Sequence, residues 1–212
     1  GGLFLKKVFV IFLTLMMLTV MALAADTLKF EANFNKTDSK KNDWTPFVGE
    51  WEIDGEFMVN YDLGSDNTNI WLELDQYGDG VWIYEYKITY DVKGGQWAPA
   101  AGLHFMVSDA EAPQRGSSYL MFQDLTEIKL YRCEAGGITR VAFTPGFQAI
   151  VGETSIIRVE YNTKTGAFTI FHNGVKVIEY VDNDPIVDGQ YISLRTNQTQ
   201  ASYDYVKVWY RK

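Results

Sequence analysis

Residues 156–180, IIRVEYNTKTGAFTIFHNGVKVIEY, indicate the fold class of this chain most directly. Hydrophobic and polar residues alternate in three short runs, and a period of two is typical of β-strands with one buried face. Asn173-Gly174 separates the second and third runs. This dipeptide is a strong hairpin signal because a type I′ turn needs positive φ at both positions. Gly166 closes the preceding turn, so the stretch predicts two consecutive hairpins.

The same alternation extends over most of the chain. Gly, Pro, Asn and Asp recur between the alternating runs at intervals of roughly a dozen residues, as in all-β sandwiches. No segment after residue 24 has a helical period. We therefore predict an all-β fold, with strands at 28–34, 49–53, 56–61, 70–74, 81–90, 102–107, 118–123, 128–133, 139–143, 156–161, 167–172, 175–180, 191–196 and 203–210.

The N-terminal residues have the composition of a targeting segment. Lys6 and Lys7 precede an apolar run, 8–23, that ends in the small residues of Ala-Leu-Ala. We interpret residues 1–24 as a secretory signal peptide and 25–212 as a single domain, which predicts a secreted, extracellular or periplasmic protein. The run is shorter than the ~20 residues of a bilayer span, which favours the signal peptide. A membrane anchor formed by an uncleaved segment is the alternative.

Charge and cysteine content restrict the expected partners and the sources of stability. The formal net charge is −8 at pH 7, and no basic stripe offsets it, so we do not expect nucleic acid as a partner. Cys133 is the only cysteine. An internal disulfide is therefore excluded, and we expect this thiol to be packed in the interior.

Glu52, Asp54 and Glu56 have the E-x-D-x-E spacing that resembles the catalytic strand of family-16 glycoside hydrolases. Such a site needs its carboxylates on one face of a continuous strand. Asp54-Gly55 is instead a two-residue hairpin signal between two apolar runs. We interpret this segment as a hairpin and predict no catalytic residue.

Longer stretches resemble the concanavalin A-like jelly rolls, a superfamily that includes laminin-G-like, family-16 glucanase-like and 3-keto-disaccharide hydrolase-like domains. The resemblance rests on the order of four segments: LKFEANF with DWTPFVGEWEIDGEFMV, then GLHFMVSD with SSYLMFQ, then residues 156–180, and finally DGQYISLRTNQTQASYDYVKVWY. It implies two antiparallel sheets forming a jelly-roll sandwich, with ligands bound on a concave sheet or in rim loops. Enzymes, lectins and adhesion modules share this scaffold, so it does not select a function.

Several residues are candidates for ligand binding. Trp97 lies in the Gly-rich loop GGQWAPA, where its ring either stacks on a sugar or caps the sandwich. His104 is opposite the apolar face of its strand, so it either contacts a ligand or is buried beneath a loop. A solvated sheet face with cross-strand ion pairs is the alternative for the remaining candidates. The predicted ligand-binding residues are Trp97, His104, Arg115, Tyr119, Gln123, Glu85 and Arg132.

The resemblance also implies a structural calcium ion, which many relatives of this fold carry near the closing strand. Asp204 in SYDYVKV matches the closing aspartate, with Glu31 and the carbonyl of Gly49 as companions. Hard oxygen ligands of this kind suit calcium. The alternative is a solvated or hydrogen-bonded Asp204. We expect no other cofactor.

Three function classes follow. The first is a secreted domain that binds a glycan or polysaccharide without catalysis. The second is a glycoside hydrolase or 3-keto-glycoside-cleaving enzyme, for which Glu85 and Asp124 are the carboxylate candidates. The third is an extracellular module that binds protein through an apolar patch.

Overall fold

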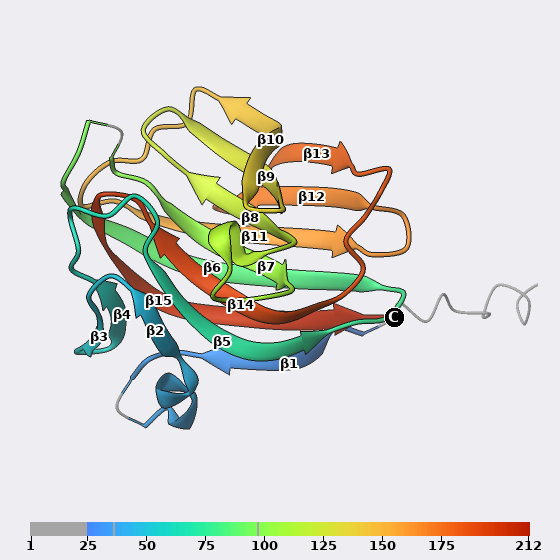
Figure 1. The fold of residues 1–212 in the computed structure, drawn as a ribbon, viewed down its shortest axis with the longest axis horizontal. Helices are drawn as coiled ribbons and strands as arrows, with labels where there is room; N and C mark the ends of the chain where they lie inside the picture. The colour runs from blue at the N-terminus through green and yellow to red at the C-terminus, as the bar shows by residue number, and fades with distance from the viewer. Residues whose placement is uncertain (1–24, 36, 97) are drawn as a thin grey trace, which may run out of the picture.

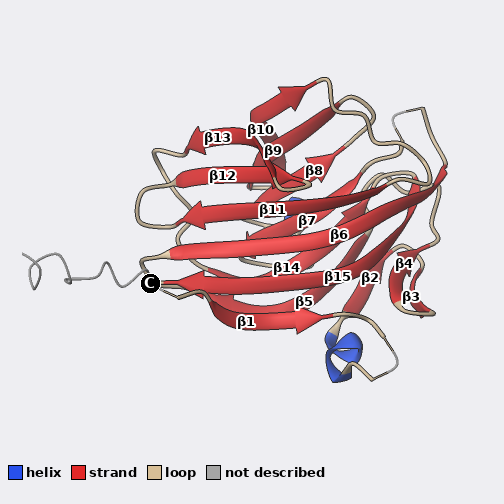
Figure 2. Cartoon of the chain, turned by 180° about the vertical axis from the view of Figure 1, so that it is seen from behind, coloured by secondary structure: helices blue, strands red, loops and turns tan. Residues whose placement is uncertain are grey.

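Residues 25–35, 37–96 and 98–212 are described in the computed structural model and form two antiparallel β-sheets packed face to face (Figures 1 and 2). Residues 1–24, which we interpreted as a signal peptide, lie outside the described residues, as does Trp97. Within the described ranges, no helix has the length and the apolar character needed to cross a bilayer.

Sheet A faces the viewer in Figure 2. Seven strands lie side by side, and β1 pairs with the C-terminal part of β15. In spatial order the strands are β13 (Val175–Val181), β12 (Ala167–His172), β11 (Thr154–Asn162), β6 (Val81–Lys93), β15 (Thr199–Arg211), β4 (Phe57–Asn60) and β3 (Trp51–Asp54), with β1 at Thr27–Ala32.

Sheet B faces the viewer in Figure 1. Two short 3-10 turns, η1 (Ser39–Asp43) and η2 (Pro113–Arg115), lie in connecting loops. In spatial order the strands are β10 (Gly137–Pro145), β9 (Glu127–Glu134), β8 (Ser118–Gln123), β7 (Ala101–Val107), β14 (Gly189–Thr196), β5 (Asn69–Gln76) and β2 (Thr45–Val48).

The all-β prediction is confirmed, and each predicted strand is present with small shifts at its ends. The E-x-D-x-E segment forms the β3–β4 hairpin, in which Asp54 pairs with Phe57 and Gly55 takes a φ of 64°. One strand, β2, was not predicted. Its sequence TPFV contains a proline and all four residues are exposed, so it lacks the alternation of a half-buried strand.

The core is formed by the inward residues of both sheets. On β6, Trp82, Tyr84, Tyr86, Ile88 and Tyr90 face inward, as the period of two requires. Buried tyrosines need hydrogen-bond partners for their hydroxyl groups, and several find them on the opposite sheet.

Tyr203 of sheet A shows how a buried hydroxyl connects the two sheets. Its Oη lies 2.9 Å from the carbonyl oxygen of Gly102 and 3.0 Å from that of Arg195, both on sheet B. The single hydroxyl proton is shared between these two oxygens, so the contact fixes β15 against β7 and β14. A bond of this kind contributes about 1 kcal/mol to stability.

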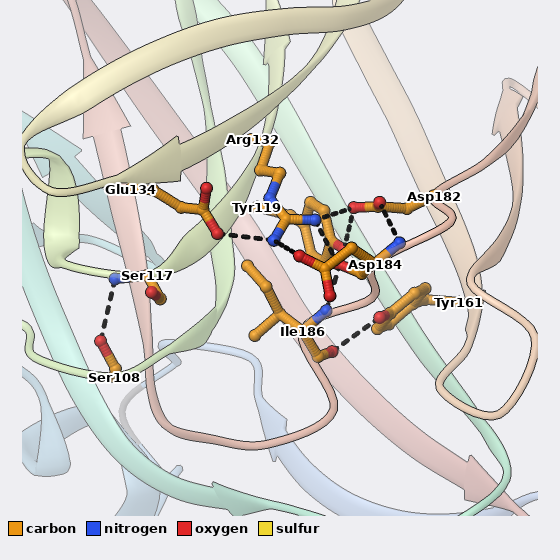
Figure 3. Close-up of polar contacts among 9 residues, drawn as sticks. All are labelled: Ser108, Ser117, Tyr119, Arg132, Glu134, Tyr161, Asp182, Asp184 and Ile186. Atoms are coloured by element: carbon orange, nitrogen blue, oxygen red, sulfur yellow. Dashed lines mark hydrogen bonds and ion pairs between the residues drawn. The ribbon is translucent and has the colours of Figure 1, made fainter.

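The outer face of sheet B is partly covered. Every residue of β7 and β8 is buried, although half of their side chains point away from the core. Residues 108–117 close over this face, and the loop is held by hydrogen bonds between Ser108 and Ser117 (Figure 3). Ser118 also donates to the carbonyl of Gln114.

Candidate functional site

A groove of about 220 Å³ lies on the uncovered part of the outer face of sheet B, and we call it the outer groove. Its base is a small hydrophobic cluster, separate from the main core, that includes Leu120 and Phe122. Tyr131 is half-buried and meets Phe122 edge to face, with ring centroids 6.5 Å apart. The lining residues are Ala100, Leu120, Phe122, Asp124, Tyr131, Ile138, Arg195 and Asn197.

Three polar side chains border this apolar base. Asp124 accepts hydrogen bonds from the backbone amides of Thr126 and Glu127 and forms an ion pair with Lys129. With its amide nitrogen turned toward Asp66, Asn197 Nδ2 donates to Asp66 Oδ1 at 2.9 Å. The outer groove therefore combines a half-buried aromatic ring with oriented acceptors and donors, the combination that sugar sites use.

Arg195 contributes a guanidinium group to the outer groove. Nη1 donates to Oε1 of Gln114 at 2.8 Å, and Nη2 donates to the carbonyl of Asp66 at 3.1 Å. The guanidinium also lies 5.5 Å from the ring centroid of Phe122. Burial lowers the pKa of Arg195, because the charged form loses hydration.

Two of the predicted ligand-binding residues are buried where residues 108–117 cover sheet B: His104 on β7 and Arg115 within the covering loop itself. His104 is fully buried, and its Nδ1 is 3.2 Å from Ser118 Oγ, so the structure corresponds to the buried alternative. Burial lowers the pKa of His104, and the nearby cations Arg115 and Arg195 lower it further. Arg115 itself is only 2% exposed and donates to the Thr68 carbonyl and to Asn67 Oδ1, both at 2.5 Å.

Tyr119 and Gln123 point into the interior, and Arg132 lies at the edge of the sandwich. Tyr119 Oη donates to Asp182 Oδ2 at 2.6 Å, and Arg132 Nη1 donates to the same oxygen at 2.5 Å (Figure 3). Arg132 also contacts Glu134 and Asp184. These contacts hold the loop after β13 in place, so Tyr119 and Arg132 have structural partners.

Glu85 lies on the outer face of sheet A, where Tyr205 donates to it at 3.0 Å and Arg158 lies 3.5 Å away. Asp124 lies beside sheet B, so the core separates the two carboxylates proposed for glycoside cleavage. The predicted ligand-binding residues within the described part of the chain do not form one site. They divide among the outer face of sheet B, the interior, the sandwich edge and the outer face of sheet A.

The predicted calcium ligands do not fit a common ion. Asp204 forms an ion pair with Lys87, and Glu31 Oε1 lies 2.9 Å from Lys207 Nζ. Each carboxylate therefore already has a cationic partner. The turn at Gly49 adjoins Asn60 and Thr68 instead. Within 25–35, 37–96 and 98–212, no group of three or more His, Cys, Asp or Glu residues is arranged to hold a metal.

A second cavity of about 400 Å³ lies where residues 144–150 approach the ends of β11 and β12. Ser155 Oγ and His172 Nε2 are 3.1 Å apart in its wall. Burial lowers the pKa of His172, which favours the neutral ring at pH 7. The ring also packs edge-on against Phe147, with centroids 4.8 Å apart.

Four residues of the outer groove were not predicted from the sequence: Tyr131, Phe122, Arg195 and Asn197. Alternation alone places Tyr131 and Phe122 on the outer faces of their strands, opposite the inward Leu130 and Met121. That signal was present in the sequence. The sequence does not show that Arg195 and Asn197 lie beside Tyr131, because they follow it by more than 60 positions in the chain.

Comparison with known proteins identifies the fold. No family model matches the chain, and no curated protein matches it in sequence. Among solved structures it is similar to the carbohydrate-binding module CBM66 from Bacillus subtilis, with 22% identity and a TM-score of 0.61 over 76% of this chain and 91% of that chain. The fold is a concanavalin A-like jelly roll.

Two other solved structures share this jelly roll. One is the potassium-bound carbohydrate recognition domain of Emp46p, with 10% identity and a TM-score of 0.61 over 85% of this chain and 95% of that chain. The other is a GlcNAcα1-4Gal-releasing endo-β-galactosidase from Clostridium perfringens, with 12% identity and a TM-score of 0.60 over 88% of this chain and 63% of that chain. At these identities the likeness establishes the fold alone, and it confirms the resemblance drawn from the sequence.

Proposed function

We propose that this chain binds carbohydrate in the outer groove. The observation that carries the proposal is the juxtaposition of the half-buried Tyr131 ring with Asp124, Asn197 and Arg195 on one face of sheet B. The ring would stack on the C–H face of a sugar, and the polar groups would bond its hydroxyls. The solved structures named above, which include a carbohydrate-binding module and a carbohydrate recognition domain, support the same class of ligand.

The size of the outer groove favours a short contact with the sugar chain. Its volume of about 220 Å³ is below the ~300–1,000 Å³ of sites that enclose drug-sized ligands. Its apolar floor is already packed, since Phe122 is 6% exposed. A single sugar unit or a chain end is therefore the ligand we expect. The composition of residues 1–24 supports secretion, which would give the protein access to extracellular glycans.

A glycan-array screen tests this proposal. Tyr131→Ala should weaken binding about tenfold, because it removes the stacking surface. Tyr205→Ala is the matched control, since Tyr205 lies on the outer face of sheet A beside Glu85. Equal loss in both variants, or binding that Tyr131→Ala leaves unchanged, would contradict the proposed site. Absence of binding to every glycan would overturn the function and direct attention to protein partners.

Two additional arms of the same screen address the earlier predictions. Repeating it with calcium and then with chelator measures whether an ion contributes to binding. A Trp97→Ala variant measures whether the loop containing Trp97 takes part. Loss of binding in this variant alone, with Tyr131→Ala unaffected, would move the site from the outer groove to that loop.

Ester hydrolysis is the second candidate function, and the hydrogen bond between Ser155 and His172 favours it. A neutral imidazole that contacts a serine hydroxyl is the pairing that activates a nucleophile. Hydrolysis of p-nitrophenyl acetate by the wild-type protein, lost in Ser155→Ala and in His172→Gln, would support this activity. Equal rates in the wild type and Ser155→Ala would rule out this pair as its source.

A further inference from the structure

The outer face of sheet B buries two arginines whose hydrogen-bond partners are all neutral. Arg115 and Arg195 are 2% and 8% exposed, respectively. Within the part of the chain that the structure describes, neither forms an ion pair with a carboxylate, whereas Arg132, Arg140 and Arg158 do. Burying a cation is costly unless an anion compensates it, so this pair needs an explanation.

The guanidinium of Arg195 has free hydrogen-bonding capacity. It carries five N–H donors, and the two bonds to Gln114 and Asp66 use two of them. Its Nε is buried and has no hydrogen-bond partner among the described residues. Nη1 and Nη2 each keep one further N–H, and the planar guanidinium group matches the two oxygens of a carboxylate or the oxygens of a sulfate.

The other cations near the outer groove are already neutralised. Lys129 lies 3.1 Å from Glu127 and also pairs with Asp124, and Arg140 lies 2.9 Å from Glu127. Asp124 is thus engaged by Lys129, which reduces its repulsion of an anion in the same groove. Arg195 is the cationic residue of the lining, and it forms no ion pair within the described residues, although the nearby carboxylate of Asp66 opposes the lowering of its pKa.

The charge of Arg195 also acts on the neighbouring buried guanidinium of Arg115. Burial lowers the pKa of Arg115 to about 9, and the nearby charge of Arg195 contributes to that shift. An anion bound at Arg195 would offset the cost of burying this charge and its repulsion of Arg115, since opposite charges favour the ionised form. The low dielectric of the site makes such an interaction stronger than it would be on an open surface.

We propose that the outer groove selects an acidic sugar, whose carboxylate or sulfate ester pairs with the guanidinium of Arg195 while the ring packs against Tyr131. This inference rests on the proposed function and specifies its ligand class. The side chains of Asp124 and Asn197 line the same groove, where they would contact the hydroxyl groups. The anion supplies the partner that the buried guanidinium lacks.

Calorimetric titration of paired probes tests the inference. Each acidic ligand is compared with its neutral counterpart: oligogalacturonate with the carboxyl-reduced oligosaccharide, sialyllactose with lactose, and a sulfated galactan oligosaccharide with its desulfated form. At least one acidic member should bind about tenfold to hundredfold more tightly than its neutral partner, as a charge-assisted hydrogen bond would give. The pair that shows this difference identifies the anion as a carboxylate or a sulfate.

Variants then assign the preference to Arg195. Arg195→Gln should abolish the difference between acidic and neutral probes, and retained binding of the neutral probe would show that the fold is intact. Arg158→Gln is the matched control, because Arg158 lies on sheet A with Glu85 and Glu160 as partners. It should leave the preference unchanged.

The possible outcomes separate this inference from the proposed function. If a neutral probe binds as tightly as its acidic partner in every pair, the acidic-sugar inference is overturned while carbohydrate binding stands. If Arg195→Gln keeps the full preference, the anion is held elsewhere and the inference is again overturned. If no probe binds, both the inference and the proposed function fail.

Discussion

Asp182 is the carboxylate on which the loop after β13 depends, and replacing it by asparagine should destabilise the protein. Its Oδ2 accepts hydrogen bonds from Tyr119 Oη at 2.6 Å and from Arg132 Nη1 at 2.5 Å (Figure 3). Its Oδ1 accepts from the backbone amide of Asp184 at 3.0 Å. The side chain is only 7% exposed, so water does not replace these bonds.

The magnitude follows from these contacts. A hydrogen bond to a charged group is worth about 1.5–3 kcal/mol, and breaking a fully buried pair costs roughly 3–5 kcal/mol. Arg132 is 16% exposed and keeps Glu134, 2.5 Å away, after the substitution. We therefore expect Asp182→Asn to lower the free energy of unfolding by about 2–3 kcal/mol at pH 7.

The pH dependence gives a second, independent readout. Burial alone would raise the pKa of Asp182, but the bonds from Tyr119, the Asp184 amide and Arg132 outweigh it, so the pKa lies below its usual range. A carboxyl with a depressed pKa stabilises the fold above its unfolded pKa of about 3.9, and this contribution is lost as the pH falls through the folded pKa. The difference between wild type and Asp182→Asn should therefore shrink as the pH falls toward 3.

Urea denaturation followed by tryptophan fluorescence measures both quantities. Asp184→Asn is the control, because Asp184 is 95% exposed and its pair with Arg132 should contribute less than about 0.5 kcal/mol. A loss below about 0.5 kcal/mol in Asp182→Asn at pH 7 would refute the assigned hydrogen bonds. A difference that stays constant down to pH 3 would refute the assigned protonation.

Three further predictions concern the core. Gly102→Ala should destabilise the protein by about 3 kcal/mol or more, or prevent folding, since its Cβ would lie 2.0 Å from the Met121 carbonyl; expression and thermal unfolding check this. Tyr203→Phe should cost about 1–2 kcal/mol in urea unfolding, because the Gly102 and Arg195 carbonyls lose their hydroxyl donor. Cys133 should react with a thiol reagent only after denaturation, because it is fully buried and burial raises its pKa; rapid labelling of the native protein would contradict its placement.

Much of the fold could be predicted from the sequence, because strands and tight turns produce patterns among residues that are close in the chain. Alternation over 156–180 and the Asn173-Gly174 turn correctly gave two adjoining hairpins, β11–β12 and β12–β13. The turn signal Asp54-Gly55 likewise correctly predicted that the E-x-D-x-E segment forms a hairpin and not one continuous strand. These features depend on residues close in the chain, where side-chain period and turn chemistry determine the conformation.

The candidate site was much less accessible to sequence reasoning. Alternation placed His104 on the outer face of β7, but only the closure of residues 108–117 over that face decided that it is buried. Tyr119 and Arg132 were grouped with it as polar candidates. They instead satisfy the carboxylate of Asp182, which follows them by some fifty or more positions in the chain.

The sequence by itself determined the strands, their turns and the all-β class, since each is set by residues within a few positions of one another. Only the tertiary structure decided which outer face is covered and which residues line the outer groove. Tyr131 and Arg195 lie close together because β9, β8, β7 and β14 are neighbours in sheet B, an order fixed by long-range pairing and core packing. The tertiary structure also decided that Arg195 is buried with no ion pair among the described residues, because its burial and its partners exist only after the sheets have packed.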